Sequence, residues 1–199
     1  MRYQRALAVL FVTAAMVLSG CGAEKDSDAA DTPPFNQADV TFVRGMIPHH
    51  RQAIQMAQLA QSRAADLQVK QLAQRIEAAQ GPEIATMLGW LRAWNRPLGA
   101  GIGGSGGMDH GGSGGMDHGG SDGMSGMMGA RDMQELRSAK GAAFDEAFLT
   151  MMIEHHKGAI DMASTQEQQG RNREALALAE QIQQDQAAEI EHMVGLLDG

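Results

Sequence analysis

The residues with the clearest chemical potential are two pairs of adjacent histidines, each with methionines nearby. A methionine lies three positions before the first histidine of each pair, and a second methionine lies six positions after the pair. These residues are Met46, His49, His50 and Met56 in the first half of the chain and Met152, His155, His156 and Met162 in the second half. Thioether and imidazole together suit Cu(I), whereas imidazole and carboxylate suit Cu(II). The two clusters are therefore candidate copper ligands.

Each cluster is spaced so that its members share one face of an α-helix. With successive residues about 100° apart, Met46, both histidines and Met56 lie within one half of the helix surface. An apolar face of this kind is normally buried, and a buried ring nitrogen without a partner costs about 1 to 3 kcal/mol. Bound metal would remove that cost. The alternative is that the histidines are hydrogen-bonded core residues and the methionines, Met56 and Met162 above all, only pack.

The two clusters belong to an internal duplication. Met46 and Met152 are 106 residues apart, and the same displacement, without a gap, pairs identical residues as far as Leu91 and Leu197. A repeat of this kind indicates two copies of one structural unit. Apolar residues recur at spacings of three and four in each copy, so residues 36–98 and 131–199 are each predicted to form a helix hairpin. Two such hairpins bury their apolar stripes by packing as an all-α, antiparallel four-helix bundle.

The helix ends and interruptions can also be anticipated. Asp39 and Asp145 lie where a cap or first-turn acid stabilises a helix start, and Gly170 or Asn172 can turn the third long helix into the fourth. Pro48 falls inside a helical pattern, as does Pro82. The second copy has Glu154 and Ala188 at these positions, so the helices are expected to continue through the prolines with a kink.

The last predicted helix adds three further candidates. A di-iron bundle needs Glu-x-x-His on two helices, and here only Glu189 with His192 fits, because the first copy has Glu83 and Thr86 at the matching positions. His192 and Met193 are expected near the inner face of this helix, with Met87 as the repeat partner of Met193. These residues would complete or gate the site. A ferritin-like metal oxidase using Glu83, Glu189 and His192 is the enzymatic alternative.

A glycine-rich segment, residues 99–130, connects the two copies. It contains Met-Asp-His twice, which places Met108, His110, Met116 and His118 on a chain that lacks the apolar residues to form a core. We expect a flexible chelator that captures copper and passes it to the bundle. A histidine-rich tract can equally bind nickel or zinc, and slippage during duplication of a plain linker is the remaining explanation.

The N-terminus predicts export and a lipid anchor. Arg2 and Arg5 precede a short apolar run that ends in Leu-Ser-Gly-Cys, so residues 1–20 are expected to be a signal peptide. Its end resembles the lipobox of bacterial lipoproteins, which would make Cys21 the lipidated residue. Residues 21–35 are acidic and lack an apolar period, as expected of a tether. The alternative is an ordinary signal peptide with an incidental cysteine.

Composition limits the remaining possibilities. Sixteen lysines and arginines against 24 acidic residues give a formal charge of −8, which excludes nucleic-acid binding driven by electrostatics. The single cysteine excludes an intrachain disulfide and a cysteine-rich zinc site. No serine or cysteine lies beside a histidine in an arrangement that would activate a nucleophile.

The histidine motifs resemble a known family. MIPHHRQAIQMA (residues 46–57) and MIEHHKGAIDMA (residues 152–163) are similar to the paired signature of the bacterial domain-of-unknown-function family 305, over about residues 36–197. The resemblance implies a ferritin-like four-helix fold in secreted or membrane-anchored proteins, some of which bind copper in the periplasm. The two motifs differ visibly where Pro48 and Gln52 are replaced by Glu154 and Gly158.

The sequence therefore predicts an extracytoplasmic copper-binding lipoprotein, in the periplasm or at the cell surface, that buffers or sequesters the metal. Cu(I) is the favoured oxidation state, a membrane holds the chain through Cys21, and a metal-transfer protein is a possible partner. The two alternatives are the ferritin-like oxidase and an interaction or scaffold bundle whose histidines are core or pH-sensing residues.

Overall fold

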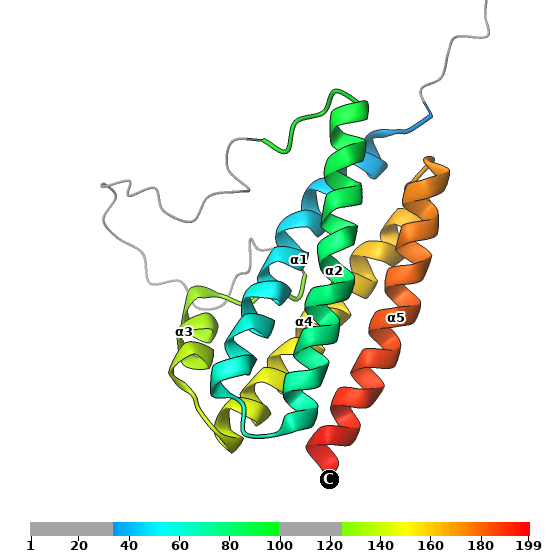
Figure 1. The fold of residues 1–199 in the computed structure, drawn as a ribbon. Coiled ribbons are helices and arrows are strands. Elements are labelled where there is room, and N and C mark those ends of the chain that lie inside the picture. The colour runs from blue at the N-terminus through cyan, green and yellow to red at the C-terminus, as the bar shows by residue number, and fades with distance from the viewer. Residues whose placement is uncertain (1–33, 100–124) are drawn as a thin grey trace, which may run out of the picture. The chain divides into compact units, whose positions relative to one another are not determined.

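Two antiparallel helix hairpins lie side by side in the computed structural model, which describes residues 34–99 and 125–199. Its helices are α1 (Gln37–Arg63), α2 (Leu67–Ala93), α3 (Ala130–Ser138), α4 (Ala142–Gln169) and α5 (Arg173–Asp198). The first hairpin is α1 with α2, the second is α4 with α5, and α1 packs against α4 (Figure 1). No strand occurs in these residues. The predicted all-α, ferritin-like four-helix bundle is confirmed.

The helices begin and end for the local reasons that the sequence suggests. Asn36 caps α1 and forms a capping box with Asp39, while Asn172 caps α5 after Gly170 ends α4. Both α1 and α2 are continuous through their prolines. A proline lacks its backbone N–H and crowds the carbonyl four residues before it, but this local cost does not end a long, packed helix.

Two buried carboxylates join the hairpins at equivalent positions. Asp39 of α1 accepts hydrogen bonds from the backbone N–H groups of Arg171 and Asn172, in the turn between α4 and α5. Asp145 of α4 accepts bonds from residues 65 and 66, in the turn between α1 and α2. Each first-turn acid therefore caps the turn of the other hairpin, which fixes how α1 and α4 lie against each other.

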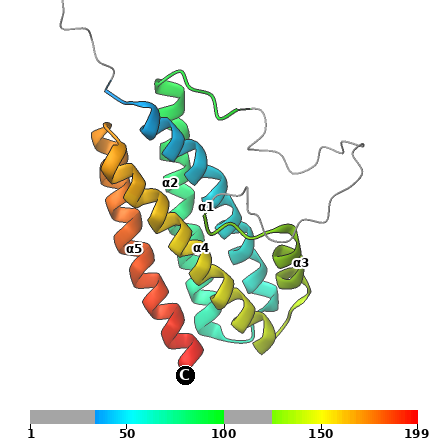
Figure 2. The same ribbon diagram turned by 180° about the vertical axis from the view of Figure 1, so that it is seen from behind.

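The short helix α3 is an addition to the predicted hairpins. It precedes α4 and lies beside α1 and α4, seen from behind in Figure 2. Met133 and Leu136 anchor it, because both are buried in the apolar cluster that contains Phe144 and Phe148 of α4. Helical structure therefore begins at Ala130, where the sequence suggested only the end of a flexible connection.

Several predicted features lie outside the described residues. The expected signal peptide, Cys21, nearly all of the tether and the loop residues Met108, His110, Met116 and His118 are among them. Within the described residues, no helix is long and apolar enough to cross a membrane.

Candidate metal centre

All four histidines of the repeated motif are fully buried between the hairpins. His49 on α1 and His155 on α4 hold equivalent positions in the two copies, and their ring centroids are 3.8 Å apart. The packing of α1 against α4 produces this approach, because each helix turns the first histidine of its motif toward the other. The two histidine pairs therefore converge in the interior, as their spacing suggested.

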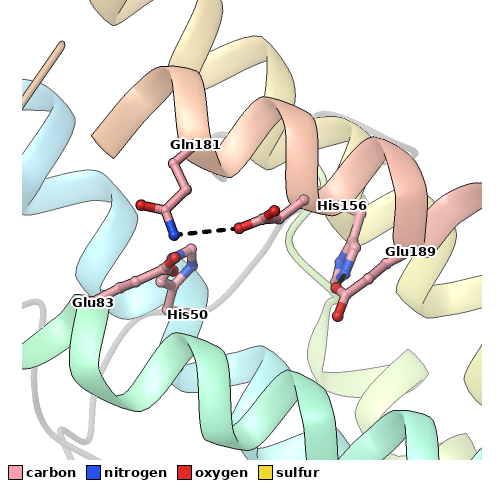
Figure 3. A network of polar contacts seen from close by, with 6 residues as sticks. His50, Glu83, His156, Gln181 and Glu189 are labelled. Atoms are coloured by element: carbon pink, nitrogen blue, oxygen red, sulfur yellow. Dashed lines mark hydrogen bonds and ion pairs between the residues drawn. The ribbon is translucent and has the colours of Figure 1, made fainter. Parts of the chain in front are cut away.

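The outer histidines each pair with a glutamate of the neighbouring helix. The Nε2 atom of His50 is 2.7 Å from Oε2 of Glu83 on α2, and Nε2 of His156 is 2.6 Å from Oε2 of Glu189 on α5. Figure 3 shows the two equivalent pairs. Sequence reasoning placed these glutamates only in the oxidase alternative. The sequence did contain a signal for these glutamates: Glu83 follows His50 by 33 residues, and Glu189 follows His156 by the same number.

Glu83 also connects the centre to solvent. Its side chain is 13% exposed, and it lines a surface groove between α2 and α5 together with Glu174 and Asp185. Glu189 is 22% exposed. Each glutamate thus bonds a buried imidazole while part of it faces water, which is a suitable arrangement for exchanging a proton or a cation with the centre.

The hydrogen bonds decide which ring nitrogens remain free. Carbonyl and carboxylate oxygens only accept, so Nε2 of His50, of His156 and of His49, which bonds the Ser125 carbonyl at 3.1 Å, must donate. In all three rings Nδ1 is buried without a hydrogen-bond partner, and in His155 both nitrogens are. A histidine that ligates a metal characteristically donates its other N–H to a carboxylate or backbone carbonyl. The unpartnered Nδ1 atoms therefore fit metal ligands.

Burial keeps the central imidazoles neutral. The pKa of His49 is lowered to about 4, mainly by burial and then by the charge of His50, while the bond to Ser125 opposes the shift. The pKa of His155 is lowered well below its usual value, again mainly by burial and then by His49. A neutral imidazole has a free lone pair, so both rings are in the ligand form at neutral pH without releasing a proton.

Two buried methionines accompany each histidine–glutamate pair. Met46 lies one turn before His50 on α1, and Met87 lies one turn after Glu83 on α2. Because α1 and α2 run antiparallel, Met46 and Met87 are displaced from the histidine–glutamate pair in the same direction along the bundle. Both methionines belong to one apolar cluster.

The second hairpin repeats this arrangement at the other end of the centre. Met152 lies one turn before His156, Met193 lies one turn after Glu189, and both belong to the second apolar cluster. In the described part of the chain, no three histidine, cysteine, aspartate or glutamate side chains are grouped so that they could hold a metal. The buried methionines beside each pair are candidate additional ligands, and their thioether sulfur suits a soft ion.

The remaining predicted ligands have different positions. Met56 is buried in the apolar cluster of Met152, whereas Met162 is half-buried and lines a surface groove beside Phe42. The expectation that His192 lies near the inner face of its helix was wrong, because its side chain is exposed. His192 and Met193 are consecutive on α5 and point about 100° apart, so burying Met193 turns His192 toward solvent.

Comparison with known proteins gives the family. The model of the domain of unknown function DUF305 matches residues 39–197. The chain belongs to the DUF305 family. No curated protein matches it. A DUF305 fragment from Deinococcus radiodurans has a similar structure, with a TM-score of 0.69 and 28% identity, over 83% of this chain and 99% of that one.

Two structures of the protein CopM are also similar to this DUF305 chain. The Cu(I)-bound form has a TM-score of 0.61 and 30% identity, over 80% of this chain and 95% of CopM. The Cu(II)-bound form has a TM-score of 0.63 and 33% identity, over 79% of this chain and 94% of CopM. The DUF305 fold is thus the scaffold on which both histidine pairs, their glutamates and the four methionines are placed.

Proposed function

We propose that this DUF305 protein binds copper and buffers or sequesters it outside the cytoplasm. The observation that carries the proposal is the set of buried, unpartnered Nδ1 atoms, three of which belong to rings whose Nε2 already donates to an oxygen. Leaving so many polar atoms unsatisfied in a core is costly unless something binds them. The similarity to CopM, which has been crystallised with Cu(I), Cu(II) and silver, supports copper as that ligand.

The methionines support Cu(I) as the favoured oxidation state. Each histidine–glutamate pair has two buried thioethers within one helical turn, and thioether sulfur binds Cu(I) far better than Cu(II). The histidines and Met46, Met87, Met152 and Met193 would hold the ion. The ferritin-like oxidase would need His192 as a ligand, and this side chain is exposed, so we propose a binding protein rather than an enzyme.

Export and anchoring remain part of the proposal. A DUF305 protein from Streptomyces coelicolor, 28% identical to this chain, is inferred to be secreted. Together with the apolar run and Cys21 at the N-terminus, this supports an exported protein held at a membrane by lipid. Mass spectrometry of the protein from its native membrane tests the anchor, because the mature chain would begin at Cys21, lack residues 1–20 and carry a diacylglycerol on the Cys21 thiol.

A copper titration with matched histidine variants tests the binding function. Anaerobic competition of the purified protein against a Cu(I) chelator should give tight binding that falls sharply in the double variant His49→Gln, His155→Gln. The control is His192→Gln, which removes an exposed histidine and should leave the affinity unchanged. Circular dichroism shows whether each variant is folded. Equal affinity of wild type and a folded double variant would contradict the proposal.

A second variant pair tests the oxidation state. Met46→Leu with Met152→Leu conserves volume and apolar character, so the core should remain folded. We expect weaker Cu(I) binding and an almost unchanged affinity for Cu(II). Oxygen consumption after addition of Fe(II) would instead support the ferritin-like oxidase.

A further inference from the structure

A segment outside the four long helices reaches the central histidines. Residues 125–128, here called the strap, run across α1 and α4 before the chain enters α3 (Figure 2). The carbonyl oxygen of Ser125 accepts the hydrogen bond from Nε2 of His49. At the other end of the strap, the side-chain amide of Gln52 bonds both backbone groups of Met128, donating to its oxygen at 2.9 Å and accepting from its nitrogen at 2.7 Å.

Gly158 is the residue that allows the strap to lie so close. A Cβ atom at this position of α4 would be 2.1 Å from the Ser125 carbonyl oxygen and 2.6 Å from Cα of Gly126. Gly126 in turn has a φ of +76°, which disfavours any other residue, and a Cβ there would meet the α4 backbone at 2.7 Å. Strap and helix thus touch through two glycines, and no larger side chain fits between them.

The strap explains one of the differences between the two histidine motifs. Gln52 and Gly158 are equivalent positions of the duplication, and both serve the same strap, one by hydrogen bonds and the other by absence of a side chain. The consequence for the histidines is also unequal. His49 has an acceptor for its Nε2–H, whereas neither nitrogen of His155 has a partner.

We propose that Gly158 and Gln52 are positioning residues that hold the Ser125 carbonyl on His49 and so prepare its Nδ1 atom to bind the metal. His50 and His156 receive this support from glutamates of α2 and α5, but His49 faces α4 and has no such glutamate. The carbonyl fixes the Nε2–H tautomer and the ring orientation. This inference rests on the proposed copper site, since it assigns the support of one of its ligands.

The test is the variant Gly158→Ala in the full-length protein. Alanine favours helix more than glycine does, so α4 should be retained while the new Cβ displaces Ser125. The control is Gly195→Ala on α5, where a Cβ would meet nothing within 4 Å. A second variant, Gln52→Leu, loosens the strap in a different way, because it removes the hydrogen bonds to Met128 without adding bulk against the strap.

Two readouts separate positioning from a general structural effect. In the metal-free protein, the ring ¹⁵N chemical shifts of His49 should show the Nε2–H tautomer in wild type and in Gly195→Ala, and a mixture of tautomers in Gly158→Ala and Gln52→Leu. Copper affinity should fall about 10- to 100-fold in Gly158→Ala, as expected when a bond that supports a ligand is lost, and stay unchanged in the control.

The possible failures are distinguishable. If His49 keeps the Nε2–H tautomer in Gly158→Ala, the positioning role is wrong, whether or not the affinity changes. A changed tautomer with unchanged copper affinity would also overturn the proposal. If wild-type protein binds no copper, the proposed function fails, while the tautomer measurement still shows whether the strap orients His49.

Discussion

Acidification should destabilise the metal-free protein because its two central imidazoles resist protonation. The folded-state pKa of His49 is about 4, against 6.5 for an exposed histidine, and burial is the main cause. The unfolded chain therefore takes up a proton as the pH falls below 6.5, while the folded protein does not. The contribution of neutral, buried His49 to the stability of the fold is therefore complete above the pKa that His49 has in the unfolded chain. It is lost as the pH falls toward the pKa that His49 has in the folded protein.

The size of the effect follows from the shift. One pKa unit corresponds to about 1.4 kcal/mol. His49 alone should therefore lower the free energy of unfolding by about 2 kcal/mol at about pH 5 and by about 3 kcal/mol at about pH 4. The pKa of His155 is lowered in the same direction, so it adds to the loss. This is a large part of the stability of a typical domain, which is about 5 to 15 kcal/mol.

Urea denaturation of the metal-free protein, followed by circular dichroism at several pH values, measures the effect. The comparison is the double variant His49→Gln, His155→Gln, whose replaced side chains do not titrate. Wild type should lose stability more steeply than this variant as the pH falls below 6.5. Identical pH profiles for the two proteins would refute the reasoning that burial suppresses protonation of these imidazoles.

Three further predictions concern the bundle and its connections. Asp39→Ala should cost about 1.5 to 3 kcal/mol of unfolding free energy, because the backbone N–H groups of Arg171 and Asn172 lose their buried carboxylate acceptor; a urea midpoint unchanged from wild type would contradict this lock between hairpins. Leu136→Ala should cost about 2 to 5 kcal/mol and speed amide exchange in α3, whose anchor it is; slow exchange in α3 would show that its anchor lies elsewhere. Replacement of residues 100–124 by a glycine–serine linker of the same length leaves the strap in place, so helicity and melting temperature should be unchanged while copper stoichiometry falls; undiminished stoichiometry would show that the loop holds no copper.

The sequence determined the four long helices, the duplication and the inward face of each histidine motif. These follow from local patterns: apolar spacing of three and four residues, capping residues such as Asn172, and a displacement of 106 residues without a gap. The burial of His49 and His50 could also be predicted, because the face they share with Met46 is the apolar one.

The partners of the buried histidines could not be predicted, because they come from residues distant in the chain. Glu83 is 33 positions from His50, and Ser125 is 76 positions from His49. A periodicity shows which side of a helix is buried but not which neighbouring helix lies there. The strap and α3 follow a glycine-rich segment without apolar periodicity, so no local pattern indicates where they dock.

Adjacent residues illustrate the difference most clearly. Consecutive side chains on a helix point about 100° apart, so both can be buried only where two neighbours receive them. On α1, His49 faces α4 and His50 faces α2, and both are buried. On α5, Met193 faces the core but His192 faces water. The sequence set the angle between such neighbours, and only the packing of the hairpins decided what each of them meets.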